Sequence, residues 1–323
     1  MNARPLLPPV IATLLLLLAM QLAVGAWSRR LPYFHKLEAI RGAQNPNLLF
    51  VGNSLLDTRV DAPAIEAASS HGLHLVPLDS ALGATEPPDQ LLLFNYSTQC
   101  HPGMRMMVLG IYDFQLTAPN HPRLSDLTGN RVLAIDRRFP VSEIAAVYGF
   151  DRFEQAEFEA MRMLPVVAYR TNAWKYTELL RRKMGSMGMP VVASNSMGQV
   201  NDFAALEANS VEDFDAQARA FLANPTLNKS YESMFSQAQS TGMKIIVVVM
   251  PMSPSHRQTF YDRPLWSQYL SAVKALLQQR GIQVIDAGNW MPSQEDFVDH
   301  LHMSPSAART FSFRLGWQLA GGS

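Results

Sequence analysis

The stretch LLFVGNS, residues 48–54, decides the fold. Four apolar residues suited to a buried strand run into a Gly-Asn-Ser turn, and a helix-like stretch follows. An unbroken apolar strand is typical of a parallel sheet that helices cover on both faces. At the carboxyl end of such a strand, Ser54 is either the N-cap of the next helix or a nucleophile aimed out of the sheet. Which of the two it is depends on what the rest of the chain supplies.

Further apolar runs repeat the strand pattern along the chain. The predicted strands are residues 48–51, 73–78, 106–109, 244–250 and 283–285. Between the last two, residues 265–279 carry apolar side chains at helical spacing, and Gly281 supplies a stop. Strands that alternate with helices predict an α/β fold with a parallel sheet.

Residues 114–242 interrupt this alternation. Helical patterns are expected at residues 141–163, 167–184, 211–222 and 229–240. The strands on either side of this segment need each other to form one core. The segment is therefore predicted to be a mainly helical insertion within a single domain that spans residues 47–323.

The N-terminus carries an apolar segment. From Leu6 to Ala26 no residue is charged, and about 20 apolar residues suffice to cross a bilayer. Residues 1–30 are therefore a transmembrane anchor or a secretion signal that is cleaved after Ala26, with 31–46 as a connector. The length of the apolar run favours a retained anchor. Arg4 before it and Arg29 and Arg30 after it leave its orientation open.

Composition excludes several classes of function. The chain has 27 basic and 27 acidic residues, so it offers no net charge for nucleic acid, which needs a basic face. Its one cysteine, Cys100, cannot form an internal disulfide. Since no Cys/His pair has zinc-ligand spacing, no metal or other cofactor is expected.

A second polar motif follows the last predicted strand. Asp299 and His302 are three residues apart, so on a turn the carboxylate can accept the imidazole Nδ1–H. Nε2 is then free to take a proton from a serine. His300 is the competing base, but it adjoins Asp299 and should point elsewhere. Because the motif lies at the carboxyl edge, it can meet Ser54 there.

Together, the Gly-Asn-Ser turn and the Asp-x-x-His motif resemble the SGNH (GDSL-like) hydrolase family. The resemblance implies a three-layer α/β/α, flavodoxin-like fold. It also implies that Ser54 is the nucleophile, His302 the general base and Asp299 its orienting partner. The backbone N–H groups of Ser54 and Gly83 would form the oxyanion hole.

One block departs from the family pattern. The family often has Gly-x-Asn-Asp after its third strand, where the asparagine donates to the oxyanion. Here Gly110-Ile111-Tyr112-Asp113 places a tyrosine at that position. Tyr112 is either an oxyanion donor of different reach or a packing residue. The resemblance covers residues 47–113 and 243–320, outside the insertion.

An apolar anchor before such a domain is similar to the membrane-tethered branch, which includes alginate O-acetylation and teichoic acid D-alanylation proteins. This implies an esterase or O-acyltransferase on the extracytoplasmic, periplasmic side. An acyl-ester or envelope glycan would be the substrate, and a membrane acyl-donor protein a partner. The alternative is a catalytically weak domain that binds polymer or scaffolds a membrane complex. His256 and Arg257 are interpreted as solvated loop residues.

Overall fold

The computed structural model describes residues 7–57, 59–70, 72–118, 123–170 and 208–321. Most of the helix expected at 167–184 lies outside these residues. By its internal contacts the chain divides into two units, which are described separately. The first contains Met1–Glu38 and Pro122–Ala193, and the second contains Ala39–His121 and Ser194–Ser323.

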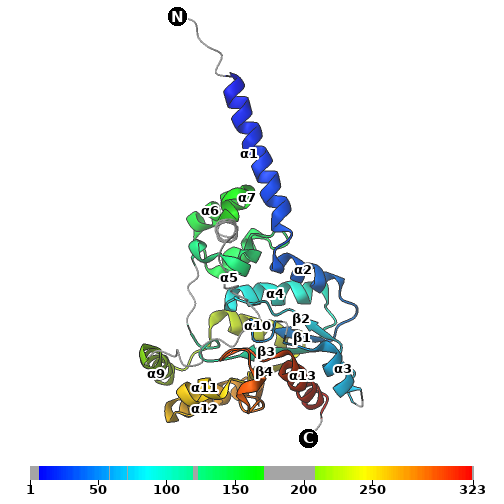
Figure 1. Cartoon of the computed structure of the whole chain (residues 1–323), viewed down its shortest axis with the longest axis vertical. Coiled ribbons are helices and arrows are strands. Elements are labelled where there is room, and N and C mark those ends of the chain that lie inside the picture. The colour runs from blue at the N-terminus through cyan, green and yellow to red at the C-terminus, as the bar shows by residue number, and fades with distance from the viewer. Residues whose placement is uncertain (1–6, 58, 71, 119–122, 171–207, 322–323) are drawn as a thin grey trace, which may run out of the picture. The chain divides into compact units, whose positions relative to one another are not determined.

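The second unit is built on a five-stranded sheet (Figure 1). Every neighbouring pair of strands is parallel, in the order β2-β1-β3-β4-β5. This is a doubly wound order, and it confirms the predicted α/β fold. The strands are β1 (Leu48–Val51), β2 (Pro77–Asp79), β3 (Met106–Ile111), β4 (Lys244–Val249) and β5 (Gln283–Asp286).

Helices cover the sheet on both faces. Figure 1 shows α4 and α10 on one side of the strands, and α3, α12 and α13 on the other. All residues of β1 and β3 are buried between these layers, which explains their unbroken apolar sequences. The helices of this unit are α3 (Ala62–Ser69), α4 (Pro87–Cys100), α9 (Ala208–Ala223), α10 (Lys229–Ser240), α11 (Pro254–His256), the π-helical turn η3 (Arg257–Tyr261), α12 (Pro264–Gln279), the 3-10 turn η4 (Gln294–Asp296) and α13 (Pro305–Leu319).

Local signals set the ends of several predicted helices. The helix expected at 229–240 is α10, and the Asn228 side chain caps it by accepting from the Ser230 N–H. The helix expected at 265–279 is α12, which starts at Pro264. Gly281 follows it with φ +71°, a conformation that glycine adopts without strain.

Two predicted boundaries in this unit are wrong. The second strand begins at Pro77 instead of residue 73, because the Asn47 side chain bonds the backbone of His74 and Val76 at 2.8 Å each. No helix follows Ser54 directly. Residues 54–57 form a turn, and the next helix, α3, starts at Ala62 with Asp61 as its N-cap.

The first unit contains α1 (Leu7–Ser28), which is long and apolar enough to cross a membrane. Its apolar side chains are exposed. The single helix expected at 141–163 is two helices, α5 and α6, because Gly149 ends α5 with φ +73°. The described elements that follow α1 are α2 (Pro32–Gly42), whose residues from Ala39 on belong to the second unit, η1 (Leu124–Asp126), η2 (Gly129–Ile135), α5 (Val141–Tyr148), α6 (Arg152–Met163) and α7 (Pro165–Ala168).

Candidate active site

Ser54 lies on a tight turn at the carboxyl end of β1. The Asn53 side-chain oxygen accepts the Leu55 N–H at 3.0 Å, and the Asn53 carbonyl accepts the N–H groups of Leu56 and Asp57. Leu56 packs where a side chain on Gly110 would stand, since a Cβ there would lie 2.6 Å from the Leu56 Cδ1. The turn is therefore fixed by Asn53 from within and by Leu56 against the sheet.

Sequence reasoning missed the side chains that hold Asn53. Its Nδ2 donates to the Gln115 Oε1 at 3.3 Å, and the Gln115 Nε2 donates to the Tyr231 hydroxyl at 2.7 Å. The Tyr231 hydroxyl in turn donates to the Gln90 Oε1 at 2.8 Å. The one available signal was the place of Gln115, just after β3 at the sheet edge where Ser54 lies.

The structure brings Ser54, His302 and Asp299 together. The His302 Nε2 lies 2.9 Å from the Ser54 Oγ. The His302 Nδ1 lies 2.8 Å from the Asp299 Oδ2 and 3.0 Å from Oδ1. With the proton on Nδ1 directed to the carboxylate, Nε2 can accept the hydroxyl proton of Ser54.

Hydrogen bonds favour the charged form of Asp299. Burial alone would raise the pKa of its carboxyl, but the His302 side chain and the N–H groups of His302 and Leu301 donate to it and hold that pKa below its usual range. A carboxylate that stays ionised stabilises the imidazolium that forms when His302 takes a proton.

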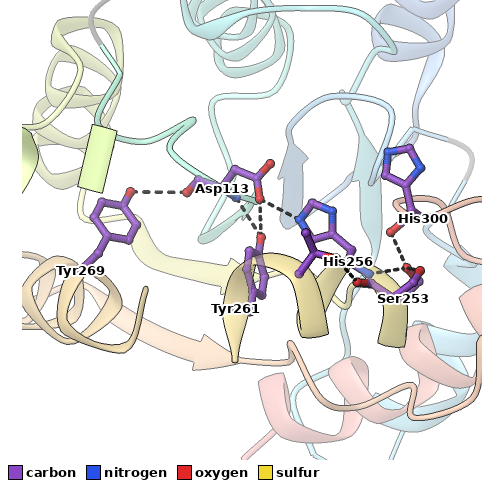
Figure 2. A network of polar contacts seen from close by, with 8 residues as sticks. Asp113, Ser253, His256, Tyr261, Tyr269 and His300 are labelled. Atoms are coloured by element: carbon purple, nitrogen blue, oxygen red, sulfur yellow. Dashed lines mark hydrogen bonds and ion pairs between the residues drawn. The ribbon is translucent and has the colours of Figure 1, made fainter. Parts of the chain in front are cut away.

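The loop that carries Asp299 and His302 is tied to the end of β4. An antiparallel bridge between Phe297 and Met303 closes the loop. Within it, the His300 carbonyl accepts from the Ser253 Oγ at 2.9 Å and from the Ser253 N–H at 3.3 Å, and Figure 2 shows the first of these bonds. The His300 ring stacks on the His256 ring, with 6.0 Å between their centroids.

His256 is not the solvated residue that the sequence suggested. It is 3% exposed, and its Nε2 lies 3.1 Å from the Asp113 Oδ1, which also accepts from the Tyr261 hydroxyl at 2.8 Å (Figure 2). The Ser253-Pro254 cap starts a helical turn that carries His256 inward, and the order of the sheet places β3 and its Asp113 beside β4. Arg257 hydrogen-bonds Asn289.

Gly83 and Tyr112, the two residues expected to complete the oxyanion hole, differ from each other in their hydrogen bonds. Gly83 lies beside Ser54, since a Cβ on it would lie 3.6 Å from the Ser54 Cβ. Its N–H donates to the Asp57 Oδ2 at 2.8 Å, so an oxyanion would have to replace that partner. Burial raises the pKa of Tyr112, and its hydroxyl makes no hydrogen bond with the part of the chain that the structure describes.

A cavity of about 530 Å³ opens beside the turn. Its wall includes Asn53, the residue before Ser54, and it is large enough for a small ligand. The residues that surround it are a mixture of acidic, amide and aromatic side chains, among them Glu86, Tyr112, Asp113, Gln115, Phe214 and Phe260. A substrate group bound there would lie next to the Ser54 turn.

Comparisons with known proteins add the following. A family model described as protein of unknown function (DUF1574) matches residues 153–311. A candidate acylhydrolase from Bacteroides fragilis NCTC 9343 is similar with a TM-score of 0.41 at 11% identity, over 88% of this chain and 93% of its own. A GDSL-like lipase from Bacteroides thetaiotaomicron VPI-5482 is similar with a TM-score of 0.40 at 10% identity, over 90% and 97%. None of the curated proteins compared with the chain matches it.

Proposed function

We propose that the protein is a serine-dependent esterase or O-acyltransferase. The observation that carries this proposal is the continuous chain from the Ser54 Oγ through the His302 ring to the Asp299 carboxylate, with contacts of 2.9 Å and 2.8 Å. Each contact lies within the range in which a base can activate a nucleophile.

In the proposed reaction, the Ser54 Oγ attacks the carbonyl carbon of an acyl ester while the His302 Nε2 takes the hydroxyl proton. The tetrahedral intermediate collapses, the bond to the leaving alcohol breaks, and His302 returns the proton to that alcohol. Ser54 is left acylated. Water or an acceptor hydroxyl then attacks the acyl carbon while the His302 Nε2 takes its proton. The bond between the acyl group and the Ser54 Oγ breaks, and His302 returns the proton to Ser54, which gives hydrolysis or transfer.

The proposed substrate is an acyl ester of an envelope polysaccharide or related polymer on the extracytoplasmic side of a membrane. Two features support it: the apolar helix α1 ahead of the catalytic unit, and the resemblance of the two motifs to membrane-tethered SGNH proteins. In the transfer reaction, a membrane protein that donates the acyl group would be the partner.

Ser54→Ala tests the proposal. It should lower the hydrolysis of p-nitrophenyl acetate by at least about 10³-fold and abolish labelling by a fluorophosphonate, with an unchanged melting temperature. Ser70→Ala removes an exposed serine hydroxyl at the end of α3 and is the matched control. Equal rates for Ser54→Ala and wild type would contradict the proposal.

A second candidate function is a catalytically weak domain that binds polymer or scaffolds a membrane complex. The observation in its favour is the Gly83 N–H, which donates to the Asp57 carboxylate where an oxyanion donor is expected. The loss of one such donor typically costs about 10²-fold or more in rate. Polymer binding that survives Ser54→Ala, in a wild type that the fluorophosphonate does not label, would favour this candidate.

A further inference from the structure

The short helix α7 lies against α1 within the first unit, as Figure 1 also shows. The Gln21 side chain of α1 accepts the Val166 N–H at 3.0 Å. One turn further along α1, a Cβ on Gly25 would meet the Pro165 side chain at 4.0 Å. The start of α7 is therefore held at the level of residues 21–25 of α1.

A second contact fixes the other end of α7. The hydroxyls of Tyr169 and Tyr33 lie 2.8 Å apart, and both residues are buried. Tyr33 lies in α2, just after α1 ends at Ser28. Residues 165–169 thus run alongside the last part of α1, from Gln21 to the residues that follow the helix.

The length of α1 gives the depth of this contact. An apolar core of about 30 Å needs about 20 helical residues, and the apolar span of α1 runs over 20 residues from Pro9 to Ser28. Since that span ends at Ser28, the contacts of α7 with Gln21 and Gly25 lie within its last two turns, beside the end of the membrane-crossing segment. At 1.5 Å per residue, Gln21 lies about 10 Å along the helix axis from the end of α1 at Ser28.

At this level the protein exposes apolar side chains. Met163, Leu164 and Val167, here called the α6–α7 patch, are 73%, 45% and 37% exposed. Single exposed apolar residues are ordinary on a protein surface, but these three lie within five positions and beside an exposed apolar helix. Exposed arginines follow both apolar segments in the sequence. Arg170 comes after the patch, and Arg29 and Arg30 come after α1.

We propose that the α6–α7 patch is a lipid-contacting surface, which inserts into the boundary region of the bilayer that α1 crosses. Apolar side chains at this depth leave water for acyl chains, while arginine side chains reach the headgroups. The inference requires that α1 is retained and not removed as a signal, because cleavage after Ala26 would remove both Gln21 and Gly25. It does not depend on the proposed catalysis.

Depth-dependent fluorescence quenching of the full chain tests the proposal. In a Cys100→Ser background, Leu164→Cys is labelled with an NBD fluorophore and reconstituted in phosphatidylcholine vesicles that carry a nitroxide on the acyl chain near the headgroup. The matched control is Phe313→Cys, an exposed apolar position of α13 in the other unit. The lipid nitroxide should quench position 164 at least about threefold more than position 313, with a blue-shifted emission at 164.

Several results would overturn the proposal. Equal lipid quenching at the two positions would do so, as would quenching of position 164 by aqueous iodide to the same extent as position 313. A mature chain that lacks residues 1–26 by intact mass, or that does not float with vesicles, would also contradict it. Met163→Cys gives an independent reading, and protection from both quenchers at both patch positions would assign the patch to a protein contact instead.

Discussion

Two histidine–aspartate pairs lie at the carboxyl edge of the sheet, and they use opposite ring nitrogens. In the His302–Asp299 pair the carboxylate contacts Nδ1, which leaves Nε2 for the Ser54 hydroxyl. In the His256–Asp113 pair the carboxylate contacts Nε2. The remaining nitrogen, the His256 Nδ1, is buried without a hydrogen-bond partner within the described residues.

The two histidines also differ in burial, whereas their aspartates do not. The His302 side chain is 26% exposed, against 4% for that of His256. The Tyr261 hydroxyl donates to the same Asp113 oxygen that His256 contacts, so that oxygen already has two partners. Of the two histidines, His302 is thus the one whose free nitrogen faces a hydroxyl, as a catalytic base requires. The His256–Asp113 pair instead links the ends of β3 and β4.

Substitution of the two histidines should give the largest difference between the pairs. His302→Gln removes the base and should lower kcat for p-nitrophenyl acetate by at least about 10³-fold. His256→Gln should keep kcat within about tenfold and lower the melting temperature instead, because it leaves Asp113 and Tyr261 with a changed buried partner.

The comparison requires rates per folded molecule, so circular dichroism at the assay temperature is the control for His256→Gln. Comparable losses of kcat in the two variants would show that the two pairs act together in the reaction. A His302→Gln variant with the wild-type rate would remove the basis for the proposed triad.

A smaller effect on kcat is expected from the Ser253–His300 hydrogen bond, which joins the end of β4 to the loop that carries Asp299 and His302. Two Ser-Pro caps are closely matched: the Oγ atoms of Ser253 and Ser304 accept the N–H of His256 and Ala307 at 3.3 Å each. Only the first of these two also donates to the His300 carbonyl. Both Ser→Ala variants should lose about 1 kcal/mol of stability as caps. Ser253→Ala alone should lower kcat, by about tenfold, with KM unchanged, because the loop that carries Asp299 and His302 loosens.

Hydrogen exchange reports on that loop without catalysis. The amides of Leu301 and His302, which donate to Asp299, should exchange faster in Ser253→Ala but not in Ser304→Ala. Ser253→Thr keeps the hydroxyl and should restore kcat. Equal exchange and equal rates in the two alanine variants would show that the Ser253 hydroxyl does not position the loop.

The sequence predicted well what local patterns determine. Four of the five strands, and the helices α10 and α12, follow from apolar runs bounded by glycine, proline and asparagine. Ser54 and the Asp299–His302 motif were found because each follows a strand, and parallel strands end at one edge.

The missed features depend on distant contacts. The strand β2 is short because the Asn47 side chain hydrogen-bonds the backbone of His74 and Val76, almost 30 residues further along the chain. The buried His256 has its hydrogen-bond partner in Asp113. The Asn53 side chain is positioned by a hydrogen-bonded chain of Gln115, Tyr231 and Gln90. These partners are brought together by the order of the strands, which no local pattern in the sequence records.

The smallest expected effect concerns the pH dependence of stability through Asp299. Its pKa in the folded protein is held below the ordinary value, chiefly by the hydrogen bond from the His302 side chain working against burial. The unfolded chain therefore binds a proton at a higher pH than the folded protein. The stability that Asp299 contributes is complete above its unfolded pKa of about 4 and is lost as pH falls below that value.

The difference in unfolding free energy between wild type and Asp299→Asn, from urea titrations, should accordingly be constant above about pH 5 and should shrink below about pH 4. In a His302→Gln background the shrinkage should be smaller but still present, because the N–H groups of Leu301 and His302 continue to donate to the carboxylate. If the wild-type and Asp299→Asn values stay parallel down to about pH 3, hydrogen bonds do not hold the Asp299 carboxylate in its charged form. The distinction drawn between the two histidine–aspartate pairs would then rest on the position of Ser54 alone.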